Sequence, residues 1–112
     1  MQISLFIGNL TKDPEKVQGQ DLCKLCIAVQ ENYTTRDGVR PTQFFNVAVW
    51  NKMAEICVKR LKKGNKVAIV GRIQNRSWED KDGIKRYAQE IVATDIEFLQ
   101  YNNDNEDDLP FN

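Results

Sequence analysis

The chain has 112 residues, a length that predicts one small domain with a short appendage. Its 16 Lys and Arg residues balance 16 Asp and Glu residues. It contains no histidine, the commonest general base and metal ligand, so neither an enzyme nor a metal site is expected. The three cysteines are an odd number and form no disulfide framework, and no basic signal region is seen at the N-terminus, so a cytoplasmic protein is expected. No apolar run is long enough to predict a membrane span.

The N-terminal half of the chain predicts three strands. Apolar residues alternate with other residues over positions 3–7, which is typical of a first strand. A turn is expected over 12–15, where a proline fixes the backbone. A second alternating run covers 23–33, with Cys23, Leu25, Ile27 and Val29 on one face. A third run covers 44–50, and the polar segment between the two runs contains Asp-Gly, a hairpin signal.

The C-terminal half predicts one helix and two further strands. The helix is expected over residues 51–63, with Asn51 as its N-cap and Gly64 as its C-terminal stop. Strands are expected over 67–73 and 87–99, separated by a second polar loop with Asp-Gly. The order β-β-β-α-β-β predicts an all-β domain with one helix. Its five antiparallel strands match the OB-fold, a small Greek-key barrel.

Aromatic residues are predicted on the outer face of the third strand. Phe44 and Trp50 are six positions apart, so their side chains point to the same face, whereas Phe45, Val47 and Val49 fill the core-facing row. This assignment also leaves Asn46 and Ala48 outside. Tyr33 and Trp78 flank the two polar loops, and many Lys and Arg residues are near them in the sequence.

Aromatic rings interleaved with cations suit single-stranded nucleic acid, because bases stack on the rings and phosphates pair with the cations. The alternative is that these aromatics plug the barrel ends or form a subunit interface. Cys23 and Cys26 form a lone CxxC pattern whose side chains diverge on a strand, and only Cys57 remains as a further thiol. Buried or half-buried structural cysteines are therefore expected, with no cofactor.

Five segments in order resemble the bacterial single-stranded DNA-binding protein family. They are "IGNLTKDPE" (7–15), "FFNVAVWNKMAE" (44–55), "LKKGNKVAIVGRI" (61–73), "RSWEDKDGIKRY" (76–87) and "DDLPF" (107–111). The resemblance implies that an OB-fold domain over residues 1–99 coats single-stranded DNA without sequence preference during replication, repair and recombination. The base-stacking positions that it implies are Tyr33, Phe44, Trp50 and Trp78. The implied phosphate contacts are Lys52, Lys62, Lys63, Arg72, Arg76 and Arg86. It also implies a homotetramer.

Residues 100–112 form an acidic tail with four acids and no base, which leaves 16 bases and 12 acids, a net charge of +4, in residues 1–99. We expect the tail to be disordered. In the family such a tail docks partner proteins, which implies that role here for Asp107, Asp108, Leu109, Pro110 and Phe111; this sequence continues one residue further, to Asn112. Two other hypotheses stay open: an adaptor of a replication or assembly complex that has lost DNA binding, and an RNA-binding module.

Overall fold

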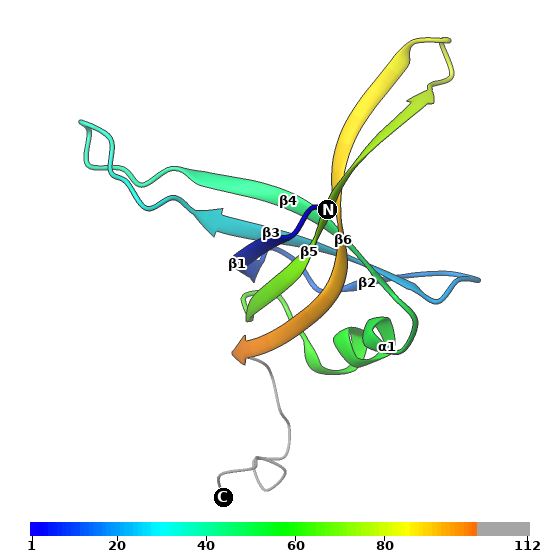
Figure 1. Ribbon diagram of the computed structural model, residues 1–112, viewed down its shortest axis with the longest axis horizontal. Coiled ribbons are helices and arrows are strands. Elements are labelled where there is room, and N and C mark those ends of the chain that lie inside the picture. Colours follow the sequence, from blue (N-terminus) through cyan, green and yellow to red (C-terminus); the bar gives the residue numbers. More distant parts are fainter. Residues whose placement is uncertain (101–112) are drawn as a thin grey trace, which may run out of the picture.

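The computed structural model describes residues 1–100, in which six strands and one helix follow the order β-β-β-β-α-β-β (Figure 1). The elements are β1 (Ser4–Leu10), β2 (Glu15–Val17), β3 (Leu22–Gln30), β4 (Thr42–Trp50), α1 (Asn51–Arg60), β5 (Lys66–Glu79) and β6 (Lys85–Gln100). No helix in this part of the chain is long and apolar enough to cross a membrane. Of the acidic tail only Gln100 is described, so the expected disorder and the DDLPF segment lie outside the described residues.

Five strands close into a barrel in the order β1-β5-β6-β4-β3, because β1 also pairs with β3. The predicted all-β OB-fold barrel with one helix is confirmed. The expectation of purely antiparallel strands is wrong at one place, since β4 and β6 pair in parallel through Val47–Ile91 and Ala48–Val92. The chain passes through α1 and β5 between these two strands, so β6 runs in the same direction as β4. The short strand β2, which pairs with β3, was not predicted because three residues are too few to show alternation.

Alternate residues of the strands fill the barrel. The predicted face of β3 is confirmed for Cys23, Leu25 and Ile27, which are buried, whereas Val29 is only partly buried; Val47 and Val49 of β4 pack in the same core. Burying one such aliphatic side chain contributes about 1.5–3 kcal/mol to folding.

Ala48 was predicted to be outside, but it is only 3% exposed. It is on the outward row as alternation requires, yet its methyl group is small and its register partners Lys24 and Val92 are larger.

The helix α1 lies against β2, β3 and β4 and buries Ala54 and Cys57 (Figure 1). It ends at Arg60, three residues before the predicted end, because Leu61 turns to an extended conformation and is itself buried in the core. Asn51 is not the N-cap: it is the first helical residue, with φ of 62°, and its N–H donates to the Asp21 carbonyl (2.8 Å). Asn is among the residues that adopt positive φ at low cost.

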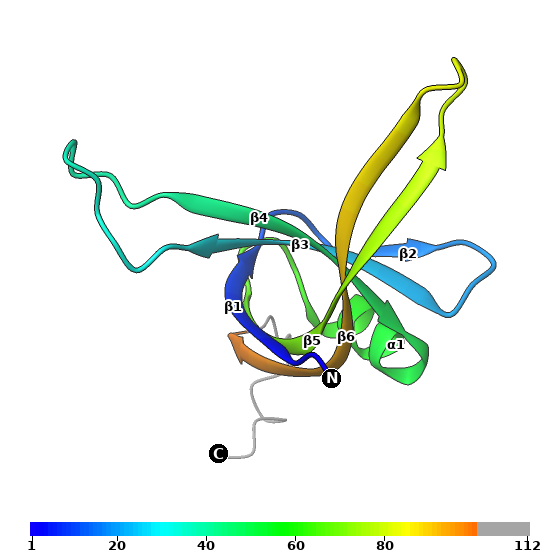
Figure 2. The ribbon, with the colours of Figure 1, turned by 45° about the horizontal axis from the view of Figure 1, so that its top comes forward.

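Two hairpin arms project from the barrel in diverging directions (Figures 1 and 2). One contains the loop between β3 and β4, and the other is formed by the outer parts of β5 and β6. Both predicted Asp-Gly turns are present, with Gly38 and Gly83 at positive φ. The β5–β6 arm is longer than the sequence predicts, since β5 continues from the predicted end at residue 73 to Glu79. The sequence does not show this extension because neither face of the arm covers a core, so its residues need not alternate in polarity.

Candidate nucleic-acid interface

The outward face of β4 carries two large aromatic side chains. Phe44 is 66% exposed and Trp50 is 44% exposed, as alternation along the strand predicts. The antiparallel register pairs Ala28 with Phe44, Lys24 with Ala48 and Leu22 with Trp50. Residues that pair directly across two strands point to the same face. The outward face of the β3–β4 pair is therefore a surface with an aromatic ring near each end and Lys24 between them.

The β5–β6 arm continues this surface. Trp78, which is 47% exposed, pairs with Arg86, and Arg76 pairs with Ala88 two residues further along. Gln74 then pairs with Glu90, so these six residues share one face of the arm. Tyr87 follows Arg86 directly and pairs with Ser77, which places it on the opposite face.

Asp80 organises the tip of the arm. Its carboxylate accepts hydrogen bonds from the N–H groups of Asp82 (2.9 Å) and Ile84 (3.0 Å), and from Nε of Arg86 (2.8 Å). The bond from the Ile84 N–H and then the bond from Arg86 hold the pKa of Asp80 below its usual range. Gly83 is at positive φ in this turn. That conformation is costly for a residue with a Cβ, so glycine suits the position. The tip that follows Trp78 is thus fixed by side-chain and backbone hydrogen bonds.

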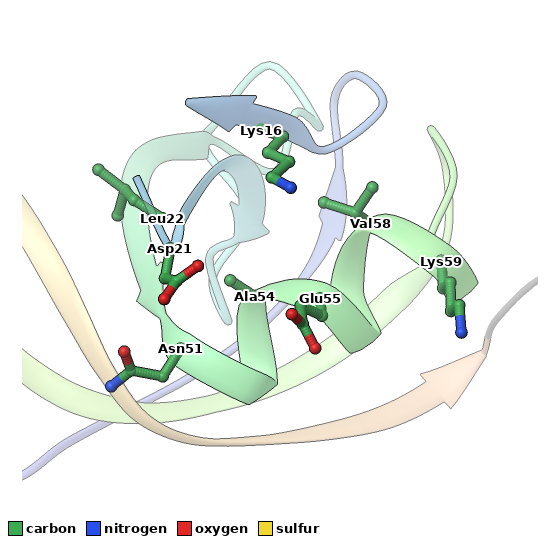
Figure 3. A pocket seen from close by; sticks show the side chains of 8 residues that line it. All are labelled: Lys16, Asp21, Leu22, Asn51, Ala54, Glu55, Val58 and Lys59. Atoms are coloured by element: carbon green, nitrogen blue, oxygen red, sulfur yellow. The ribbon is translucent and has the colours of Figure 1, made fainter. Parts of the chain in front are cut away.

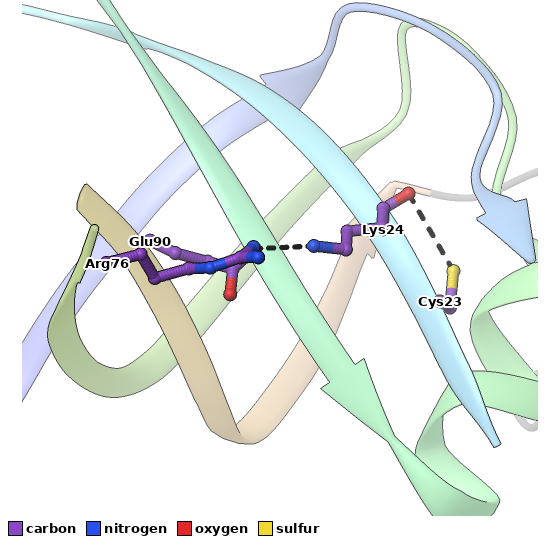
Figure 4. Close-up of polar contacts among 4 residues, drawn as sticks. All are labelled: Cys23, Lys24, Arg76 and Glu90. Atoms are coloured by element: carbon purple, nitrogen blue, oxygen red, sulfur yellow. Dashed lines mark hydrogen bonds and ion pairs between the residues drawn. The ribbon is translucent and has the colours of Figure 1, made fainter. Parts of the chain in front are cut away.

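An ion-pair cluster joins the two faces (Figure 4). Nζ of Lys24, on β3, lies 2.7 Å from Oε2 of Glu90 on β6, and Nη1 of Arg76 on β5 lies 3.6 Å from the same oxygen. The Glu90 side chain is 12% exposed, whereas that of Arg76 is 54% exposed. The cluster ties the β3–β4 face to the β5–β6 face, so the aromatic residues of both belong to one surface.

Two hollows adjoin the cluster, and each contains one tryptophan. The first, of about 540 Å³, is lined by Trp78 together with Lys12 and Asn46. The second, of about 580 Å³, is lined by Trp50 together with Gln20 and Gln74. Lys24, Arg76 and Glu90 line both hollows. The cluster therefore lies between the hollow that contains Trp78 and the hollow that contains Trp50.

The other predicted site residues are distributed around this surface. Tyr33 is exposed in the loop between β3 and β4, at the base of the first arm rather than on a strand as predicted. Arg72 shares by alternation the outward face of β5. Lys52 is in the first turn of α1, and Lys62 and Lys63 follow the helix; none of these three lines either hollow. The roles predicted for all these residues stay predictions.

A separate hollow of about 350 Å³ lies between α1 and the β2–β3 hairpin (Figure 3). Its charged lining residues are two lysines, Lys16 and Lys59, and two carboxylates, Asp21 and Glu55. Its lining includes no aromatic residue. The hollow therefore lacks the combination of ring and excess cation that suits a stacked base and its phosphate.

Sequence reasoning missed Lys24 and Glu90. Lys24 is between the buried residues Cys23 and Leu25, so alternation alone could have placed it on the outward face of β3. Glu90 precedes the core residue Ile91 in the same way. Their proximity could not be read from the chain, because 66 residues separate them and only the barrel topology brings them together.

Comparison with known proteins identifies the family of the chain. The model of the single-strand binding protein family matches residues 1–99. A single-stranded DNA-binding protein of Caldanaerobacter subterraneus subsp. tengcongensis is 42% identical over 99 residues, with 86% of this chain and 66% of the relative covered. One of Neisseria meningitidis serogroup A is 38% identical over 112 residues, with 96% of this chain and 64% of the relative covered. The chain thus spans slightly less than two thirds of the length of these relatives.

A solved structure described as the Plasmodium falciparum SSB complex with ssDNA has a TM-score of 0.77 to this chain at 21% identity, covering 89% of this chain and 96% of the other. At that identity the similarity shows a shared fold, the OB-fold barrel described above. The family match, by contrast, extends over nearly the whole described part of the chain. The chain belongs to the single-strand binding protein family.

Proposed function

We propose that this chain binds and coats single-stranded DNA without sequence preference, as a non-catalytic protein of the bacterial cytoplasm acting in replication, repair and recombination. The observation that carries the proposal is the single outward surface that spans both strand pairs and combines exposed Phe44, Trp50 and Trp78 with cations. Relatives named single-stranded DNA-binding proteins support it.

Successive bases stack on the aromatic rings in this proposal. Phe44 and Trp50 supply two platforms on β4, Trp78 supplies a third on the arm, and Tyr33 supplies a fourth in the neighbouring loop. Each stacked base contributes about 1–3 kcal/mol, and every base has a flat face, so stacking is tolerant of sequence.

The phosphates are neutralised by basic residues along the same path. Arg72 and Arg76 are on the outward face of β5, and Arg86 is opposite Trp78 on β6. Lys52, Lys62 and Lys63 extend the basic surface around α1. Phosphate contacts release counterions, so the affinity falls as the salt concentration rises.

The homotetramer remains part of the proposal. Leu5 and Ile7 of β1 are 63% and 47% exposed, and their register partners on β5 are Val70 and Ala68. Together they form an outward apolar strip on the barrel, and a small domain gains core by covering such a strip with another copy. The double variant Leu5→Asp, Ile7→Asp is expected to lower the molecular mass of the assembly measured in solution. Ile84→Asp, at a similarly exposed apolar position on the arm, is expected to leave that mass unchanged.

The acidic tail docks partner proteins in this proposal. Asp107 and Asp108 steer it to a basic rim, and Leu109, Pro110 and Phe111 enter an apolar pocket of the partner. Replacing Leu109 and Phe111 by serine is expected to abolish capture of replication and recombination proteins while binding to oligo-dT persists. Peptides ending at Phe111 and at Asn112 test whether the position of the terminal carboxylate matters.

Tryptophan fluorescence tests DNA binding directly. Adding oligo-dT is expected to quench the emission of Trp50 and Trp78, because a stacked base contacts each ring. Trp50→Ala combined with Trp78→Ala is expected to weaken oligo-dT binding strongly while leaving the circular dichroism spectrum unchanged. An unchanged affinity in that double variant refutes the stacking mechanism, and tighter binding of oligo-U than of oligo-dT points to RNA instead.

A further inference from the structure

Glu90 is an acidic residue in the middle of a surface proposed to bind an anion. It lies between the hollow that contains Trp50 and the hollow that contains Trp78. A carboxylate at that position repels a phosphate unless a cation neutralises it. Its position at the centre, rather than at the edge, of the aromatic surface calls for a specific role.

The contacts of Glu90 converge on one oxygen atom. Nζ of Lys24 approaches Oε2 at 2.7 Å and Nη1 of Arg76 approaches the same atom at 3.6 Å (Figure 4). The Glu90 side chain is almost covered, whereas those of Lys24 and Arg76 remain partly open to solvent, at 33% and 54% exposure. Two cations from different strands thus face one point, which a single negatively charged oxygen fills.

We propose that Lys24 and Arg76 form a phosphate-binding site that the Glu90 carboxylate occupies in the free protein and that a DNA phosphate takes over on binding. This inference rests on the proposed function. A phosphate oxygen carries the charge and the acceptor geometry of a carboxylate oxygen, so both groups compete for the same donors. The cations are accessible from the hollows on both sides, which a phosphate between two stacked bases enters.

Glu90 limits the affinity of the site in this arrangement. When a phosphate takes Lys24 and Arg76, the carboxylate loses its partners and must attract a counterion or water. Binding is then an exchange of one anion for another rather than the neutralisation of free cations. The exchange also lowers the number of ions released, which makes the affinity less dependent on salt. The free protein meanwhile keeps two cations from different strands in position for the DNA.

The test compares Glu90→Gln with Glu55→Gln by titration of labelled oligo-dT. Both variants add one unit to the net charge and keep the side-chain shape, but Glu55 is exposed on α1 and lines neither hollow. Glu90→Gln is expected to bind several-fold more tightly than Glu55→Gln at low salt, with a salt dependence steeper by up to about 0.7 in log–log slope. Glu90→Asp, whose carboxylate is one methylene shorter, is expected to give an intermediate affinity.

A double-mutant cycle with Lys24→Met identifies the site. Lys24→Met is expected to cost little in the native background, where Glu90 competes for the lysine, and to cost at least about fivefold in the Glu90→Gln background, where the lysine is free for phosphate. Equal effects of Glu90→Gln and Glu55→Gln, weaker binding by Glu90→Gln, or equal costs of Lys24→Met in both backgrounds each refute the proposal. Failure of the native chain to bind oligo-dT refutes the proposed function instead, and thermal unfolding without DNA checks that each variant is folded.

Discussion

The two faces of the β5–β6 arm make different predictions for two neighbouring aromatic residues. Trp78 shares its face with Arg76 and Glu90, whereas Tyr87 is on the reverse face and is 73% exposed. If DNA follows the surface that joins the arm to β4, truncating Trp78 removes a stacking platform and truncating Tyr87 does not. The pair therefore tests which face of the arm binds DNA, with the two residues only one register step apart.

The size of the effect follows from the exposure of the Trp78 ring. Trp78 is 47% exposed, which leaves room for a base to stack on its ring. Trp78→Ala is therefore expected to cost about 2 kcal/mol, within the range of about 1–3 kcal/mol per stacked base. That free energy corresponds to a factor of about 30 in the dissociation constant. Tyr87→Ala is expected to change binding by less than about 0.5 kcal/mol, as is usual for a surface substitution away from a contact.

Fluorescence anisotropy of end-labelled oligo-dT at one fixed salt concentration measures both variants. Neither residue belongs to the core, so the unfolding temperature is expected to stay close to that of the native chain in both cases. A loss for Tyr87→Ala as large as that for Trp78→Ala contradicts the assignment of the interface to one face. An unchanged affinity for Trp78→Ala contradicts its role as a stacking platform.

Further predictions concern the thiols and the barrel closure. In the folded protein without DNA, a thiol reagent is expected to modify Cys26, on the outward face of β3, and not the buried Cys23 and Cys57; oligo-dT is expected to slow that reaction. Burial raises the pKa of Cys57 from 9.0 to about 12 and that of Cys23 to about 11. The unfolded chain therefore loses these protons first, and the free energy of unfolding falls above pH 9 by up to about 1.4 kcal/mol per pH unit for each thiol. Urea titrations from pH 8 to 11 are expected to show a smaller decline in Cys57→Ala. Gly8→Ala places a methyl group 2.5 Å from the Ala28 carbonyl oxygen, where β1 meets β3, and is expected to destabilise the barrel by about 1–3 kcal/mol in the same titration.

The sequence predicts those parts of the fold in which one side of a strand faces the core. Alternation in β3 and β4 identified the buried rows correctly and placed Phe44 and Trp50 outside, because burial of one face imposes the pattern. The outer part of the β5–β6 arm was missed, since it is held by hydrogen bonds between two exposed strands and buries no row. The N-cap at Asn51 was wrong because the backbone uses that residue for its positive φ instead.

The candidate site, too, could be predicted from the sequence only in part. Single residues such as Trp78 stand out by type, so the aromatic set could be proposed from the chain alone. The pairing of Lys24 with Glu90 depends on which strands become neighbours, and that is decided by barrel closure rather than by local pattern.

The parallel joint between β4 and β6 has a mechanical consequence. These strands are paired at two positions only, whereas β5 and β6 are paired along the full length of β5. The two halves of the aromatic surface also meet at this joint, where the ion pair between Lys24 and Glu90 links β3 to β6. With so few ladder pairs at this joint, the Lys24–Glu90 ion pair is a further link between the β3–β4 face and the β5–β6 face. Single-stranded DNA that contacts both faces, as proposed, would therefore cross a joint with few paired residues, next to the ion pair that links β3 to β6.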